Sequence, residues 1–454
     1  MSWDLGAEEL GGADESLLPD RTSASYLGQV FQAAPRRGLV AVEDIRDHKG
    51  YLLWSRGQPV TPELRERLIA RRLMEPLEKA LEFRKSVRQG DVVNIAGELL
   101  EQCPILVQLL GDRQSQIMML LGQARLSAGP GMLLTLMAEH RPDALRHSVL
   151  VAMISAWLAV RLQLPPLLMR GAAEAGLLHD IGEMFLPLDI QQPSGRLDFQ
   201  QWRRLSVHPL LACSLLRESG LYDETVVVAV REHHERVDGS GYPTGSTRIS
   251  PLGRVLLSAE VLATLILDGA NAVARTTIAL RMIPGQFPAD VVEAVLERLR
   301  AIAGDQVQPQ QSVALASAME DLLQRLQRAA QGVETLVSEA RLSAAQLALA
   351  KRLQHQLQHY TIAIHDTGAP AISQHPDWLT AEPEVAVEVG RIIREMSWQL
   401  PGLVRHTQLM VCANGGDPAQ WQSLLDAIDV SLHRPAANAC EEPAVAVAEA
   451  LVED

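Results

Sequence analysis

Aromatic and basic residues are both scarce in this chain of 454 residues. Only 4% of the residues are Phe, Trp or Tyr, and 41 Lys and Arg stand against 55 Asp and Glu, for a formal net charge of -14. A general nucleic-acid-binding surface needs clustered basic side chains, so this balance argues against one, although a local anion site stays open. The abundance of Ala and Leu instead indicates a mainly α protein.

Long apolar runs and paired cysteines are also missing. The most apolar run, residues 255–267, is too short to span a membrane and carries Glu260, so no membrane span is predicted. Six acidic residues precede the first Arg at position 21, which is the opposite of a signal peptide. The four cysteines show no CxxC spacing and fit a reducing compartment; they are Cys103, Cys213, Cys412 and Cys440. We therefore expect a cytoplasmic protein.

The chain is long enough for several domains, and its composition changes along its length. The first residues are Gly-rich and acidic, whereas alternating apolar text after Gly38 predicts short strands and a helix. Apolar residues at helical spacing dominate the rest, and after residue 306 they predict a hairpin or bundle that could also mediate self-association. The predicted parts are a flexible acidic leader (1–34), a small α/β module (35–84), a helical connector (85–130), a helical domain (131–305), a C-terminal helical region (306–434) and a mobile tail (435–454).

The stretch 233–245, HHERVDGSGYPTG, holds the densest chemistry in the chain. Adjacent histidines are awkward on an ordinary helix because neighbouring side chains point about 100° apart. The glycines and proline that follow cannot continue a helix and predict a loop that can hold its backbone close to a bound group. The stretch therefore predicts a helix end that carries ligands, followed by a structured loop.

Six of the thirteen histidines lie between positions 140 and 234, more than chance placement would put there. Each of these residues alone is more often a capping or half-exposed helix residue, but together they lie on consecutive predicted helices. Imidazole and carboxylate ligands suit iron, manganese, zinc or nickel, and two ions that share a carboxylate can hold a hydroxide for hydrolysis. The residues of this pattern are His147, His179, Asp180, His208, His233 and His234.

The texts GLLHDIGEMFLP, SVHP and REHHERVDGSGYPTG, in this order, resemble the HD-GYP proteins, a bacterial branch of the HD-domain phosphohydrolases. The similarity covers about residues 140–300. It implies an HD-domain helical bundle with two or three divalent metal ions, iron or manganese, that hydrolyses cyclic di-GMP, a bacterial second messenger. The small N-terminal module also resembles one that precedes this domain in some relatives.

The same resemblance implies roles for individual residues. Asp180 would bridge the metal ions, and Asp180, His179 and His208 would be catalytic. The implied metal ligands are His147, His179, Asp180, His208, His233, His234 and Glu260. The implied substrate-binding loop consists of Asp238, Gly239, Gly241, Tyr242 and Pro243.

Three departures from the family pattern leave a second function open. Glu183 stands where the family has a lysine, which sets negative charge against a phosphate. Glu260 replaces an aspartate and can still bind a metal ion, whereas residues 268–271 replace a basic segment. The alternative is a catalytically degenerate module that acts as a signalling or protein-interaction adaptor.

Overall fold

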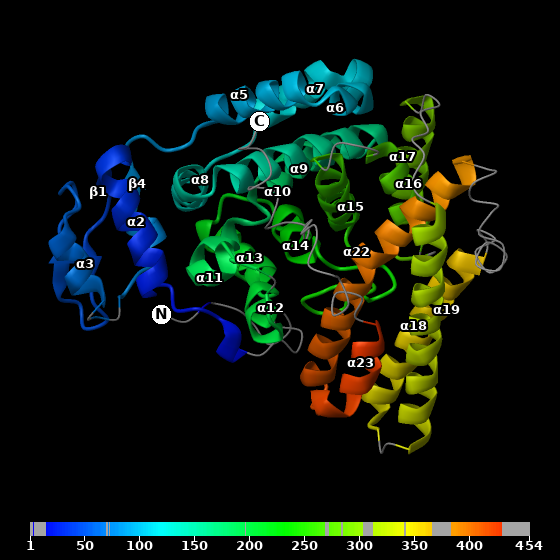
Figure 1. The fold of residues 1–454 in the computed structure, drawn as a ribbon. Coiled ribbons are helices and arrows are strands. Elements are labelled where there is room, and N and C mark those ends of the chain that lie inside the picture. Colours follow the sequence, from blue (N-terminus) through cyan, green and yellow to red (C-terminus); the bar gives the residue numbers. More distant parts are fainter. Residues whose placement is uncertain are drawn as a thin grey trace. The chain divides into compact units, whose positions relative to one another are not determined.

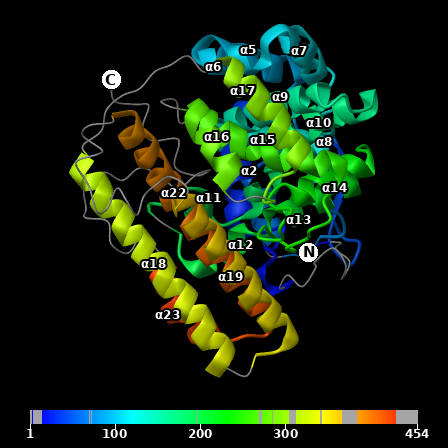
Figure 2. The same cartoon turned by 90° about the vertical axis from the view of Figure 1, so that its right-hand side faces the viewer.

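The structure is a computed structural model that divides into two compact units (Figures 1 and 2). Unit 1 comprises Met1–Glu235, Tyr242–Asp268 and Pro443–Asp454, and unit 2 comprises Arg236–Gly241 and Gly269–Glu442. The structure describes residues 3, 15–69, 71, 73–195, 197–267, 272–282, 285–302, 312–339, 342–365 and 383–428. The mobile tail predicted for 435–454 and the replaced segment 268–271 lie outside the described residues.

A small α/β module follows the first long helix of unit 1. Its strands form two separate antiparallel pairs, β1 with β4 and β2 with β3. Such short pairs need a helix packed on them, and α3 contacts β3 in this way. The elements are β1 (Leu39–Ala41), β2 (Ile45–Arg46), β3 (Leu52–Trp54), α3 (Pro62–Ile69), α4 (Leu77–Ala80) and β4 (Leu81–Phe83).

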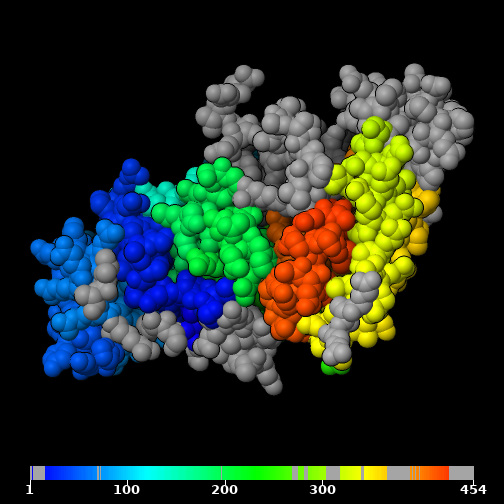
Figure 3. Space-filling view, turned by 60° about the horizontal axis from the view of Figure 1, so that its bottom comes forward, coloured from blue at the N-terminus to red at the C-terminus, as the bar shows by residue number. Residues whose placement is uncertain are grey.

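Helix α2 (Ala24–Arg37) corrects the prediction of a flexible leader, which was wrong for residues 24–34. The Ser23 side chain accepts a hydrogen bond from Tyr26 N and caps the helix. Tyr26 is buried and stacks on Phe185 with ring centroids 4.4 Å apart. Figure 3 shows this N-terminal segment in blue against the green helices of unit 1. The sequence before residue 15 is Gly-rich and acidic, and the prediction extended its flexibility to residues whose buried side chains have helical spacing.

The larger part of unit 1 is helical, as the sequence predicted. Helix α9 lies at its centre, contacts α8, α10 and α15, and is buried at every position from Ser148 to Val160. A helix that is apolar all round is a core helix. The elements are η1 (Glu15–Leu17), α5 (Gln89–Gln102), α6 (Pro104–Leu110), η2 (Gly111–Arg113), α7 (Gln114–Gly122), α8 (Ala128–His140), α9 (Pro142–Arg161), α10 (Pro166–Leu178), η3 (Ile181–Phe185), α11 (Leu188–Gln191), α12 (Phe199–Leu205), α13 (His208–Ser219), α14 (Glu224–Glu232) and α15 (Pro251–Leu267).

Two helices, and not one, occupy residues 199–219. Helix α12 ends at Leu205 and α13 begins at His208. Pro209 has no backbone N–H and is favoured in the first turn of a helix, so it marks a new start. The split places His208 at a helix N-terminus rather than within a helix.

Among the described residues, α9 is the one helix long and apolar enough by composition to cross a membrane. The bent pair Gln89–Gln102 and Pro104–Gly122 passes the same test only if it is counted as one span with a 108° bend. In α9, 78% of the apolar window is buried inside the protein, and the core helix of a soluble protein also meets this criterion. The expected lack of a membrane span therefore stays a prediction.

Unit 2 is built from long helices that share one apolar core. Helix α18 packs against α19, α22 and α23, as Figure 2 also shows for α18 and α19. Leu326, Leu353 and Trp421 are buried in this core. The elements are α16 (Ala272–Met282), α17 (Ala289–Ile302), α18 (Ser312–Glu339), α19 (Ala344–His365), α22 (Pro383–Ala413), η4 (Pro418–Trp421) and α23 (Gln422–Ile428).

Candidate metal centre

Helix ends bring the predicted metal ligands together in unit 1. His179 is the C-cap residue of α10 and is followed by Asp180, while His208 is the first residue of α13. His233 is the C-cap residue of α14, and Glu260 lies on α15. His147 lies in the second turn of α9 and His234 follows His233. Five helices therefore supply one cluster.

Two groups of side-chain atoms in this cluster are close enough to hold metal ions. His147, His179 and Asp180 form the first group, and the ligand atoms within each group lie within 4.8 Å of one another. Glu260 adjoins the first group, since its Oε2 lies 3.0 Å from His147 Nε2 and 3.2 Å from His179 Nε2. The second group consists of Asp180, His208, His233 and His234. All seven predicted ligands are therefore in place around the two groups.

Asp180 belongs to both groups. Its Oδ2 lies 2.9 Å from His179 Nε2, while its Oδ1 lies 3.2 Å from His208 Nε2 and 3.6 Å from His233 Nε2. One oxygen thus faces each group. In this position Asp180 could contribute one oxygen to each of two ions, as the predicted bridging role requires.

The backbone fixes which ring nitrogen of three histidines carries the proton. The Nδ1 of His179, His208 and His233 lies 2.8, 2.8 and 2.6 Å from the carbonyl oxygens of Gly176, Leu205 and Val230, respectively. A carbonyl can only accept, so each Nδ1 donates and each neutral ring presents a bare Nε2 to the cluster. These partners orient the rings as metal ligands are oriented.

The inward-facing nitrogens of His208, His233 and His179 face one another or a carboxylate. The Nε2 atoms of His208 and His233 face each other at 3.1 Å. His179 Nε2 is buried and makes no hydrogen bond, although Asp180 is near. Lone pairs that converge on each other and on a carboxylate repel unless a cation lies among them. The residues present therefore fit divalent metal ions.

Burial and the neighbouring charges shift the pKa values of the cluster in opposite directions. Burial disfavours a charged His179, but the carboxylates of Asp180 and Glu260 outweigh it and raise the pKa of His179 well above its usual value. Burial alone would raise the pKa of Asp180, yet the neighbouring imidazoles hold it well below its usual range. Burial, opposed only in part by the Asp180 hydrogen bond, lowers the pKa of His233 to about 4. The neighbouring carboxylates thus favour proton binding at His179, whereas burial opposes it at His233.

Gly182 explains why the His-Asp pair is followed by Ile-Gly. A Cβ at this position would lie 2.2 Å from the carbonyl oxygen of His208 and 2.8 Å from Ala212 N. The absence of a side chain lets η3 pack directly against the start of α13. This close approach brings Asp180 and His208 into one cluster.

Tyr242 of the signature loop is packed on the cluster. Tyr242 stacks on His234 with centroids 4.5 Å apart, and the Trp202 ring meets Tyr242 edge-on at 5.4 Å. Tyr242 N also donates to His234 O at 3.0 Å. Of the five predicted loop residues, Tyr242 and Pro243 belong to the unit that holds the cluster, whereas Asp238, Gly239 and Gly241 belong to unit 2.

The carboxylates of Glu235 and Glu232 fix the backbone at the end of the signature loop and after it. The sequence predicted no function for either residue. Glu235 accepts hydrogen bonds from Thr244 N at 2.7 Å, from the Thr244 hydroxyl at 2.7 Å and from Ser246 N at 3.0 Å. Glu232 accepts from the backbone N and hydroxyl of Ser250. Acidic residues beside a Gly-rich loop could have signalled this function, since such loops expose backbone donors.

The structure also gives Glu183 a partner that the sequence did not indicate. Glu183 is 5% exposed and accepts a hydrogen bond from the guanidinium of Arg141, which is itself 8% exposed. Arg141 lies at the junction of α8 and α9, and nothing in its local sequence marks it. The negative charge of Glu183 is therefore compensated within the domain.

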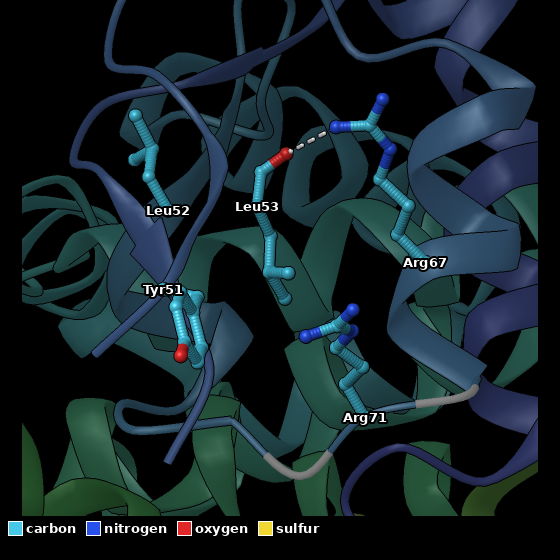
Figure 4. Close-up of a pocket in the computed structure, with 5 residues that line it drawn as sticks. All are labelled: Tyr51, Leu52, Leu53, Arg67 and Arg71. Atoms are coloured by element: carbon cyan, nitrogen blue, oxygen red, sulfur yellow. Dashed lines mark hydrogen bonds between the residues drawn. The ribbon is translucent and has the colours of Figure 1, made fainter. Parts of the chain in front are cut away.

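A separate pocket in the α/β module carries no predicted site residue. Figure 4 shows its lining by Tyr51, Leu52, Leu53, Arg67 and Arg71. Both arginines are engaged, since Arg67 Nη1 donates to Leu53 O at 3.0 Å and Arg71 Nη1 lies 2.8 Å from Asp47 Oδ2.

The helical fold and the cluster together define a class: helical domains with a histidine–aspartate centre in which one carboxylate serves two groups of metal ligands. Residues 131–307 match the profile of the family described as HD domain. The match to an HD domain agrees with the predicted resemblance to the HD-domain phosphohydrolases.

Comparisons with individual proteins agree with this class. The chain is 40% identical over 111 residues to a cyclic di-GMP phosphodiesterase of Pseudomonas aeruginosa, a match that covers 24% of this chain and 27% of that protein. It is 33% identical over 89 residues to 3'3'-cGAMP-specific phosphodiesterase 3 of Vibrio cholerae, which covers 19% of each chain. The matches thus span about a quarter or less of these two relatives.

One solved structure is also similar. Bd1817, an HDG"Y"P protein from Bdellovibrio bacteriovorus, is 23% identical to the chain, and the match covers 47% of this chain and 70% of that one with a TM-score of 0.30. This TM-score is too low to establish a common overall fold.

Proposed function

We propose that the HD domain is a metal-dependent phosphodiesterase that hydrolyses cyclic di-GMP or a related cyclic dinucleotide. The observation that carries the proposal is the position of Asp180, whose two carboxylate oxygens face two separate groups of imidazoles. Divalent ions held there supply the neutralisation of phosphate charge and the activated water that phosphodiester hydrolysis requires.

The donor set supports iron or manganese, because imidazole and carboxylate together suit these ions. Two ions, or three, are proposed. His147, His179, Asp180 and Glu260 would hold one ion, and Asp180, His208, His233 and His234 another. Backbone carbonyls orient three of the rings, so the protein holds its ligands in place before a metal ion binds.

The substrate class rests on the relatives and on the signature loop. The two curated relatives are named as phosphodiesterases of cyclic di-GMP and of 3'3'-cGAMP, two cyclic dinucleotides. The contact of Tyr242 with the predicted ligand His234 supports a loop that meets the substrate beside the metal ions. Asp180, His179 and His208 are the proposed catalytic residues, and Asp238, Gly239, Gly241, Tyr242 and Pro243 the proposed substrate-binding residues.

The cellular setting is also a proposal. An acidic chain of this kind supports a cytoplasmic protein in bacterial second-messenger signalling that does not bind nucleic acid. The long helices of unit 2 offer a surface for self-association or for a signalling protein.

A second candidate function is a degenerate HD-GYP module that acts as an adaptor. The observation in its favour is Glu183, which replaces the lysine of the family pattern. The pairing of Glu183 with Arg141 weakens this argument, because the pair carries no net charge.

One experiment separates the two functions. The full chain is purified with iron or with manganese, its metal content is measured, and cyclic di-GMP and 3'3'-cGAMP are followed separately over time. We expect turnover of at least one dinucleotide that is abolished in His179→Ala and retained in His355→Ala, an exposed histidine of α19. Bound metal without conversion of either dinucleotide, even at high protein concentration, would refute the enzyme and leave the adaptor.

A further inference from the structure

The middle of the signature loop belongs to a different compact unit from its two ends. Residues up to Glu235 and from Tyr242 onward belong to unit 1, whereas Arg236–Gly241 belongs to unit 2 with the C-terminal helices. Residues 236–241 are thus continuous in sequence with His234 on one side and Tyr242 on the other. Two of these loop residues, Asp238 and Gly239, accept hydrogen bonds from side chains of α19.

The Asp238 carboxylate is divided between the loop and α19. Its Oδ1 accepts from Ser240 N at 2.9 Å and from the Ser240 hydroxyl at 2.6 Å. Its Oδ2 accepts from Gln356 Nε2 at 3.0 Å, and the Gln356 side chain is buried. The first oxygen therefore shapes the loop internally, and the second ties it to the helix.

A second bond from the same helix holds the next residue. Arg352 Nη1 donates to Gly239 O at 2.7 Å, a charge-assisted hydrogen bond. Gly239 has φ of 76°, in the left-handed region that other residues adopt only with strain, so the direction of its carbonyl is set by a conformation special to glycine. Arg352 and Gln356 are four residues apart and therefore share one face of α19.

Other elements of unit 2 also contact residues 236–241 of the loop. Val237 N donates to Gln286 O at 3.0 Å, and the Arg236 guanidinium lies 5.3 Å from the centroid of the Phe287 ring. His406 of α22 is buried, interacts electrostatically with Asp238, and has no hydrogen bond to either ring nitrogen. The loop is thus held by side chains and backbone from three parts of unit 2.

We infer that Gln356 and Arg352 are positioning residues of the enzyme, which hold Asp238 and Gly239 of the signature loop in the conformation that receives the substrate. This inference rests on the proposed function, since it assigns the loop to the same reaction. Arg352 and Gln356 donate to loop residues, so we expect their effect on the loop and not on metal binding.

The test uses the full chain with two pairs of matched variants. Gln356→Ala and Arg352→Ala remove the two contacts, whereas Gln358→Ala and Lys351→Ala remove a side-chain amide and a positive charge from exposed positions of the same helix. Arg352→Lys keeps a donor for the Gly239 carbonyl. Metal content, amide hydrogen exchange of residues 236–241, and KM and kcat for cyclic di-GMP and 3'3'-cGAMP are measured for each variant.

We expect full metal content in all variants, faster exchange of the loop amides in Gln356→Ala and Arg352→Ala, and a KM raised about tenfold in both, as for the loss of a hydrogen bond to a charged group. Arg352→Lys should recover part of the loss, and the two exposed-site variants should match the parent. Unchanged loop exchange in both test variants, or equal effects in the exposed-site variants, overturns the inference. Absence of turnover in the parent overturns the proposed function instead, and the exchange measurement still decides whether α19 holds the loop.

Discussion

Arg141 and Glu183 form a buried ion pair that joins the α8–α9 junction to η3, one turn after Asp180. The sequence alone placed an uncompensated negative charge at Glu183, where the family pattern has lysine. In the structure the guanidinium comes from a position 42 residues earlier in the chain. The negative charge of Glu183 is thus neutralised by a cation from a different helix end.

The first prediction concerns the loss of the negative charge of Glu183. Glu183→Lys would place two cations together in a buried site, and Glu183→Gln would leave Arg141 without its counter-ion. Removal of one partner from a buried pair costs about 3–5 kcal/mol, so both variants should lower the free energy of unfolding of unit 1 by several kcal/mol. Chemical unfolding of the metal-free protein measures this effect.

A surface ion pair provides the control for the first prediction. Arg36 pairs with Glu139 at 2.7 Å, and its side chain is 80% exposed. Arg36→Ala should therefore change stability by about 1 kcal/mol or less. If Glu183→Lys is as stable as the parent and also binds substrate more tightly, the pair has no structural function and the uncompensated charge was the correct interpretation.

The second prediction concerns the shared carboxylate. Asp180→Ala removes an oxygen from both groups of ligands, so metal content should fall nearly to zero. His147 belongs to the first group alone and His234 to the second alone, so His147→Ala and His234→Ala should each leave about half the metal. Metal analysis of the purified proteins, with His355→Ala as control, checks this result. An Asp180 variant that keeps half of its metal contradicts the bridging position.

The third prediction concerns the pH dependence of metal binding. Burial disfavours a charged His179, but the carboxylates of Asp180 and Glu260 outweigh it and raise the pKa of this ring well above its usual value, so the metal-free ring binds a proton more tightly than a free imidazole does. A metal ion must displace that proton, and affinity should therefore rise with pH while the ring is protonated, by up to about tenfold per pH unit for each proton released. Chelator competition at several pH values measures the slope. A slope of zero would mean that His179 is already neutral.

The grouping of the cluster's histidines with Asp180 was predictable from sequence because several of them are adjacent along the chain. His179 precedes Asp180 directly, His233 precedes His234, and helix ends next to turns are natural places for ligands. The mainly helical fold was predictable for a similar reason, since apolar spacing is a local signal.

Long-range pairings could not be predicted in this way. Gln356 reaches Asp238 across 118 residues and Arg141 reaches Glu183 across 42, and no local pattern couples either pair. The helix of residues 24–37 was missed for a different reason. Its apolar positions have helical spacing, but the acidic Gly-rich text before them dominated the composition of the segment.

The last prediction concerns a buried acid in unit 2. Burial, against the opposing effects of Gln399 and Arg275, raises the pKa of Glu395 to about 7. Because the folded state then binds a proton more tightly than the unfolded state, Glu395 lowers stability as pH rises from about 4 to about 7, and the loss persists above that range. Glu395→Gln keeps the acceptor for Gln399 and removes the charge, so it should stabilise unit 2 by about 2–3 kcal/mol at about pH 8 and by little at about pH 4. Thermal unfolding at both pH values, with the exposed Glu334→Gln of α18 as control, measures the difference. An equal gain at both pH values would mean that packing, and not the charge of Glu395, is responsible.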